Sequence, residues 1–92
     1  MSFTLYRTDT LVNTAKKFFK RHPDLKPEFE DLLVQLEEDP FARRLRLHAL
    51  EGRHQGKHAV SLTYSFRVVL TLEMRANKII LLDIGSHDEG YR

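Results

Sequence analysis

The sequence predicts an α+β domain in the element order β-α-α-β-β-β, with a helical hairpin packed on a curved, mainly antiparallel sheet. Residues 8–22 and 24–39 repeat apolar side chains at the three- and four-residue spacing of a helix face. Residues 57–84 instead hold three runs rich in apolar and β-branched side chains. Residues 3–7 alternate in polarity and predict a short first strand.

Local signals bound the two helices. Thr8 or Asp9 can cap the first helix, and Pro23 ends it because proline disfavours a helical residue before it. The second begins at residue 24 or 25 and ends at Asp39-Pro40. Each helix carries an apolar stripe predicted to face the core: Leu11, Val12, Ala15, Phe18 and Phe19 in the first, and Leu25, Phe29, Leu32, Leu33 and Leu36 in the second.

Three strands are predicted after a connector, at residues 57–63, 66–72 and 79–84. The last of them is apolar on both faces, so we expect it to lie in the centre of the sheet. In the strand before it, alternation places Arg67 on the face opposite Val68. If the helices cover the Val68 face, Arg67 is an exposed residue on the other face. If that face is concave and flanked by the connector, His48, Arg53 and Lys57 lie beside Arg67.

Composition fits one soluble, cytoplasmic domain spanning residues 1–92. Hydrophobic residues make up 41% of the chain, which is sufficient for one modest core. The absence of cysteine excludes disulfides and cysteine-based metal sites. The first residues lack the features of a signal peptide, and no apolar run approaches the roughly 20 residues that span a bilayer, so no membrane association is expected.

Positive charge is concentrated in the second half of the chain. Residues 1–42 hold six Lys/Arg against eight Asp/Glu, whereas residues 43–92 hold nine against five. A basic patch of this density attracts phosphate backbones, although a solvated loop would also carry lysine and arginine. The side chains expected to bind RNA are Arg44, Arg46, Arg53, His54, Lys57 and His58.

Four further residues suit phosphate and proton chemistry: His48, Arg67, His87 and Tyr91. Metal-independent RNA cleavage requires a base for the 2′-hydroxyl, an acid for the leaving 5′-oxygen and guanidinium groups for the developing charge. Histidine titrates near neutral pH and serves either proton role. A metal site is not expected, because His54 and His58 would lie about 13 Å apart along a strand. No cofactor is expected.

Each of these residues also has a purely structural interpretation. Arg67 could be a solvated sheet residue paired with Glu73 or Asp83, and His48 could be a partly buried strand residue. His87 could form a local turn hydrogen bond with its neighbour, and Tyr91 could pack on the core.

Four features of the chain occur together in one known family: the element order, the segment at residues 48–53, the pair Phe66-Arg67 and the C-terminal residues 83–92. In these features the chain resembles the RelE/ParE superfamily, the toxins of bacterial type II toxin–antitoxin systems, and most of all its RelE and YafQ-like branch. It implies a ribosome-dependent endoribonuclease that cleaves messenger RNA, inhibits translation and is held inactive by a cognate antitoxin in a hetero-oligomer. Contacts to ribosomal RNA would then fall on the basic patch.

The resemblance also implies residue roles. Arg67 matches the strand arginine that RelE uses on the phosphate, and His48 and His87 match histidines important in YafQ-like toxins. Tyr91 falls where RelE has its functional tyrosine, and His58 falls near a RelE lysine. The identity of the general base stays open.

A second class of function remains compatible with the sequence. This is a non-enzymatic binder, either a ParE-like gyrase-binding toxin or a toxin fold that has lost catalysis. The proton-transfer side chains His87 and Tyr91 beside Arg67 favour the ribonuclease, because a binding surface does not need them.

Overall fold

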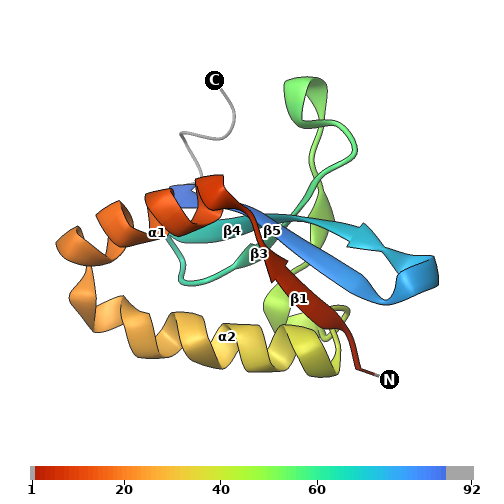
Figure 1. Ribbon diagram of the computed structural model, residues 1–92, viewed down its shortest axis with the longest axis horizontal. Coiled ribbons are helices and arrows are strands. Elements are labelled where there is room, and N and C mark those ends of the chain that lie inside the picture. Colours follow the sequence, from red (N-terminus) through yellow and green to blue (C-terminus); the bar gives the residue numbers. More distant parts are fainter. Residues whose placement is uncertain (1, 87–92) are drawn as a thin grey trace.

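The structure is a computed structural model that describes residues 2–86. His87 and Tyr91 lie outside the described residues. The elements within that range are β1 (Thr4–Arg7), α1 (Asp9–Arg21), α2 (Lys26–Glu38), β2 (His48–Ala49), β3 (His58–Ser61), β4 (Phe66–Glu73) and β5 (Lys78–Ser86) (Figure 1). In residues 2–86, neither helix has the length and apolarity needed to cross a membrane.

Within the described residues, the five strands form one sheet in the order β1-β5-β4-β3-β2. β1 pairs with β5 in parallel, and every other neighbouring pair is antiparallel. The strand predicted to be central, β5, has a partner on each side. The α+β prediction, with a helical hairpin on a mainly antiparallel sheet, is confirmed.

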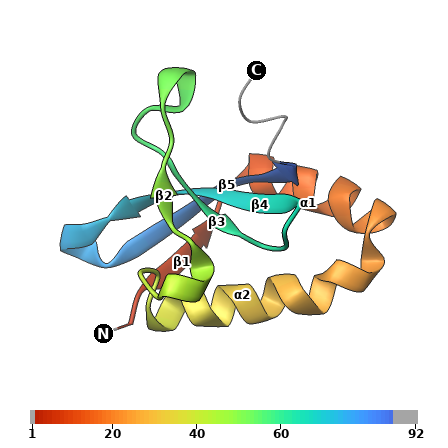
Figure 2. The ribbon, with the colours of Figure 1, turned by 180° about the vertical axis from the view of Figure 1, so that it is seen from behind.

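One face of the sheet and the inner faces of both helices form the hydrophobic core. In Figure 1, α2 runs beneath the sheet and α1 lies above α2, level with the sheet, and Figure 2 shows the arrangement from behind. The buried core residues include Leu11 and Phe18 from α1, Phe29, Leu32, Leu33 and Leu36 from α2, and Val60, Val68, Leu70, Ile79, Leu81 and Ile84 from the sheet. The opposite face of the sheet is therefore left for other contacts.

Thr8 fixes the start of α1 against the centre of the sheet. Its hydroxyl oxygen accepts a hydrogen bond from the Leu11 amide at 3.1 Å, as an N-cap does, and donates one to the Leu81 carbonyl at 2.9 Å. Of the two predicted caps, Thr8 is therefore the one that the chain uses. Because Leu81 belongs to β5, the same side chain sets where α1 lies relative to the sheet.

The segment after β3 differs from the prediction. β3 ends at Ser61, and residues 62–65 form a loop closed by the Phe66 carbonyl, which accepts hydrogen bonds from the amides of Leu62 at 2.9 Å and Thr63 at 3.2 Å. Alternation along the strand predicted at residues 57–63 would carry Tyr64 onto the face of Val60, but Tyr64 is 97% exposed. Once the loop closes on Phe66, the strand alternation that would have turned Tyr64 inward no longer applies.

Candidate nucleic-acid interface

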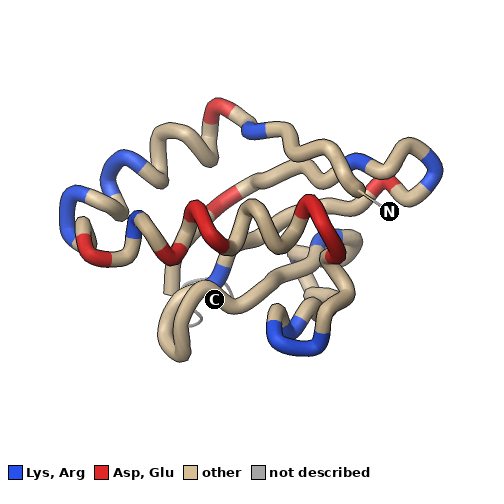
Figure 3. Tube along the Cα trace, turned by 90° about the horizontal axis from the view of Figure 1, so that it is seen from below, with Lys and Arg blue, Asp and Glu red and all other residues tan. Residues whose placement is uncertain are grey.

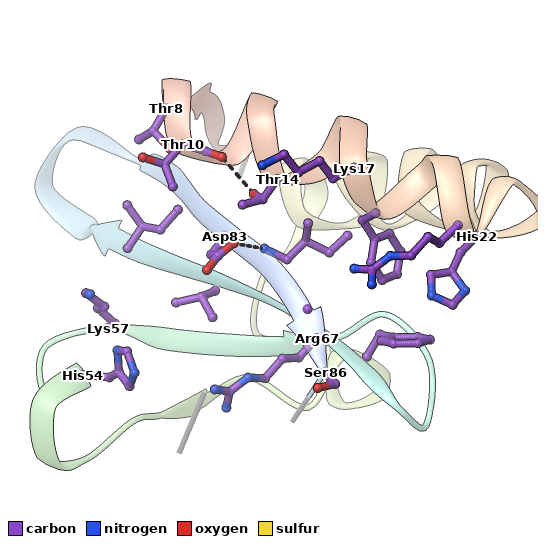
Figure 4. Close-up of a pocket in the computed structure, with 17 residues that line it drawn as sticks. Thr8, Thr10, Thr14, Lys17, His22, His54, Lys57, Arg67, Asp83 and Ser86 are labelled. Carbon is purple, nitrogen blue, oxygen red and sulfur yellow. Dashed lines mark hydrogen bonds between the residues drawn. The ribbon is translucent and has the colours of Figure 1, made fainter. Parts of the chain in front are cut away.

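A groove of about 760 Å³ lies on the sheet face that faces away from the core. One side of α1 forms one wall, β4 and β5 form the floor, and the segment before β3 forms the other wall (Figure 4). Its lining includes Thr8, Thr10, Thr14, Lys17, Arg21, His22, His54, Lys57, Phe66, Arg67, Val69, Asp83, Gly85 and Ser86.

The α1 wall contains residues that are not among the predicted site residues. Thr10, Thr14, Lys17 and Arg21 follow one another at spacings of four, three and four residues, so they share one face of the helix. Figure 4 shows Thr10, Thr14 and Lys17 on the α1 side of the groove. The polar stripe was visible in the sequence, but its position beside Arg67 depends on tertiary packing.

Arg67 lies in the floor of the groove and is only 2% exposed. Register places it between Ser61 of β3 and Gly85 of β5, so its side chain is on the face opposite Val68, as predicted. The expectation that Arg67 is exposed, however, is wrong. Its neighbours and the groove walls enclose the side chain, and Gly85 across the ladder has no side chain to compete for that space.

The second wall carries His54 and Lys57, both half-buried. They lie at the end of the 3₁₀ turn η3 (Gly52–His54) and just before β3. Gly52 and Gly56 bracket this stretch at φ values of +68° and +91°, a region that residues with a side chain rarely adopt. These two glycines let the chain reverse and bring His54 and Lys57 over the sheet, opposite α1 (Figure 4).

Charge in the groove is predominantly positive. Among the described lining residues, Lys17, Arg21, Lys57 and Arg67 are cationic, and Asp83 is the one carboxylate. In Figure 3, acidic residues gather along α2, whereas Lys and Arg mark α1 and the segment at residues 43–46. A groove with this balance attracts a phosphate chain, and its half-enclosed walls strengthen each contact.

Other predicted residues lie elsewhere. His48 shares the Arg67 face by register, but it is exposed on the edge strand β2, does not line the groove, and its Nδ1 lies 2.9 Å from the Arg46 carbonyl oxygen. Arg53 is exposed on η3 and also does not line the groove. The expectation that His48 and Arg53 flank Arg67 is therefore wrong, because the turn at residues 52–56 brings His54 to the groove, together with Lys57, which was predicted there.

His58 is on the opposite side of the sheet. It pairs with Leu70 and shares the face of Val60, which belongs to the core. Its Nδ1 is buried and has no hydrogen-bond partner among the described residues. His58 does not reach the groove, because successive strand residues point to opposite faces of the sheet and its neighbour Ala59 takes the face that carries the groove.

Arg44 and Arg46 line a second pocket, which shares Ser86 with the groove. Ser86 is the last described residue and lines the groove as well. His87 follows Ser86 directly in the chain, and both His87 and Tyr91 stay predictions from the sequence.

An aromatic group closes one end of the groove. The His22 ring lies 4.7 Å from the Phe18 ring and 4.8 Å from the Phe66 ring, between centroids. His22 is thus packed among aromatic side chains, whereas His54 stands on the groove wall. In residues 2–86, no three His, Cys, Asp or Glu side chains gather in a way that could hold a metal ion.

Comparison with known proteins identifies the fold. A scan against protein-family models finds no match, and a search of curated proteins finds no significant one. Solved structures match over nearly the whole chain. YafQ from E. coli is 14% identical, with a TM-score of 0.80 over 98% of this chain and 99% of that one.

Two further structures show the same likeness. A chain of the E. coli DinJ-YafQ toxin–antitoxin complex is 15% identical, with a TM-score of 0.78 over 100% of both chains. A YoeB/ParE toxin from Agrobacterium tumefaciens is 19% identical, with a TM-score of 0.73 over 92% of this chain and 99% of that one. The chain therefore has the RelE/YafQ-like toxin fold that its sequence resembles.

Proposed function

We propose that this protein is the toxin of a type II toxin–antitoxin system and that it cleaves messenger RNA on the ribosome without a metal ion. The observation that carries the proposal is the enclosure of Arg67, 2% exposed, in the floor of a groove with cations on both walls. An enclosed guanidinium has a fixed position, unlike a solvent-exposed one, and is therefore preorganised to stabilise the negative charge that develops on a reacting phosphate.

The chemistry needs three actions at one phosphate. The 2′-hydroxyl of the preceding ribose loses its proton to a base, and its oxygen forms a bond to phosphorus. The bond from phosphorus to the 5′-oxygen then breaks, and an acid protonates that oxygen. The products are a 2′,3′-cyclic phosphate and a 5′-hydroxyl, so no water enters this step.

Residues of this chain can be assigned to these actions. Arg67 donates hydrogen bonds to the phosphate oxygens, and Lys17 and Lys57 hold the flanking backbone from opposite walls. His54 and His87 are the proposed proton-transfer groups. Tyr91 orients the attacking hydroxyl or stacks on a base.

The first test separates a ribonuclease from a gyrase poison. We expect the purified protein to cut messenger RNA on programmed ribosomes, with cuts mapped by primer extension, and to leave the same RNA intact when ribosomes are omitted. DNA supercoiling by gyrase should proceed normally. Intact message together with stalled gyrase would support the ParE-like alternative, and no effect on either would indicate a binding protein that has lost catalysis.

The proposed partner is a cognate antitoxin encoded beside the toxin gene. Because the groove is basic, we expect a partner that covers it with acidic residues or displaces the segment after Ser86. Co-expression with the neighbouring gene product should yield a tight hetero-oligomer and restore growth. A neighbouring protein that neither co-purifies with this chain nor relieves toxicity would contradict the proposal.

A further inference from the structure

The groove continues into a second pocket on the same side of the molecule. This pocket, of about 740 Å³, lies between the 3₁₀ turn η2 (Arg43–Leu45), the loop after β3 and the end of β5. Its described lining is polar: Arg44, Arg46, Ser61, Thr63, Tyr64, Ser65 and Ser86. We refer to it as the Tyr64 pocket.

Two residues connect the Tyr64 pocket to the groove. Ser86 lines both cavities, and Ser61 lines the pocket while pairing directly with Arg67 across the β3–β4 ladder. Neighbouring strands lie about 4.8 Å apart, so the pocket begins one strand away from the backbone of Arg67. A strand of nucleic acid with a phosphate at Arg67 would thus have its next nucleotides at this pocket or along α1.

Tyr64 is exposed at the tip of its loop and contributes little to the packing of the protein. It is 97% exposed, so almost none of its ring packs against the protein. Its loop is nevertheless held in shape, because the Thr63 hydroxyl oxygen accepts hydrogen bonds from the amides of Ser65 at 3.2 Å and Phe66 at 3.3 Å. Because the loop is already ordered, it loses little conformational entropy when a ligand binds. Its exposed aromatic ring therefore offers a surface on which a base can stack.

Two arginines line the same pocket as Tyr64. Arg44 is held by the hydrogen bond that its Nε donates to the Gln35 side-chain oxygen on α2. Arg46 follows as the C-cap of η2, in a left-handed backbone conformation at φ +56°. Both cations therefore stand beside an exposed aromatic ring, the combination that binds single-stranded nucleic acid with little dependence on sequence.

We propose that the Tyr64 pocket binds one nucleotide of single-stranded RNA next to the phosphate held at Arg67. Its base stacks on Tyr64, and its phosphate contacts Arg44 and Arg46, with pocket hydroxyls as additional donors. This inference rests on the proposed function. The nucleotide belongs either to the message that is cut or to ribosomal RNA beside it, which offer the same chemistry.

Binding can be measured without cleavage by using a short single-stranded 2′-O-methyl RNA, in which the attacking hydroxyl is blocked. In fluorescence anisotropy titrations, Tyr64→Ala should weaken binding by about fivefold or more, the lower end of what one stacked base contributes. Tyr64→Phe should bind as the wild type does, because it keeps the ring. Arg46→Asn tolerates the left-handed backbone and should reduce the salt dependence of binding by about one phosphate contact.

Tyr6→Ala is the matched control, since Tyr6 is 46% exposed on β1, at the other edge of the sheet. A photoreactive phenylalanine analogue at position 64, cross-linked on programmed ribosomes, then identifies which RNA lies in the Tyr64 pocket. A cross-link to the message or to ribosomal RNA supports the proposal and distinguishes its two sources.

Failure of this inference differs from failure of the proposed function. If the wild type binds and cuts RNA but Tyr64→Ala binds as tightly, or if position 64 cross-links only to protein, the Tyr64 pocket is not an RNA site. If the wild type binds RNA through Tyr64 but makes no cut on ribosomes, the Tyr64 pocket is supported as an RNA site and the ribonuclease assignment is contradicted. A wild type that binds no single-stranded RNA overturns the Tyr64 pocket, whereas the ribonuclease assignment is decided by cleavage on ribosomes.

Discussion

Replacing Arg67 with methionine is expected to slow cleavage of messenger RNA by about two to three orders of magnitude, the usual effect of losing one preorganised donor to a developing charge. The fold should survive. Arg67 is 2% exposed, and methionine keeps most of its volume. Methionine also removes the cost of keeping a charge out of water, which offsets part of the polar contacts that are lost with Arg67. Single-turnover cleavage on programmed ribosomes measures the rate, and thermal unfolding measures the stability.

Two variants control for this experiment. Arg67→Ala should lose both activity and about 2 kcal/mol or more of stability, because it leaves a cavity in the enclosed floor of the groove. Arg75→Met removes an exposed arginine from the turn between β4 and β5 and should change neither quantity. Normal cleavage by a folded Arg67→Met protein would remove Arg67 from the mechanism and leave the groove as a binding surface.

The elements that the sequence predicts well are those specified by local periodicity. The stripe of Leu32, Leu33 and Leu36 and the apolar run at residues 79–84 appear in the structure as the core face of α2 and the centre of β5. The parallel pairing of β1 with β5 has no local signal, because it joins residues more than seventy positions apart, such as Thr4 and Lys78. Strand neighbours of this kind are decided by the packing of the whole chain.

The sequence predicts only part of the candidate site, because some of its features are set by local strand geometry and others depend on tertiary packing. Alternation correctly assigns Arg67 to the face away from Val68, because strand geometry is local. Its burial depends on α1 and on the turn at residues 52–56, which the sequence does not place in space. The choice between His48 and His54 depends on that turn as well. The left-handed conformation of Arg46 has no sequence signal, since glycine or asparagine is the usual residue there.

Histidine substitutions test which imidazoles carry the proton transfers. We expect His54→Gln and His87→Gln each to slow the chemical step by about 10²- to 10⁴-fold, while RNA binding changes little, because glutamine keeps a polar side chain but cannot exchange a proton near neutral pH. His54 is chosen because it lines the groove, and His87 because it follows Ser86 and matches the toxin pattern. His48→Gln is the matched control, since His48 is exposed on β2 and outside the groove.

The pH dependence of single-turnover cleavage distinguishes the roles. Loss of the base should remove the limb of the rate profile that rises with pH, and loss of the acid should remove the limb that falls. Tyr91→Phe should be milder than Tyr91→Ala if the ring orients or stacks, because it keeps the ring. Severe loss in His48→Gln with normal rates in His54→Gln would return the proton-transfer role to His48. Equal, severe loss in both Tyr91 variants, with near-normal rates in His87→Gln, would make the tyrosine hydroxyl the catalytic group.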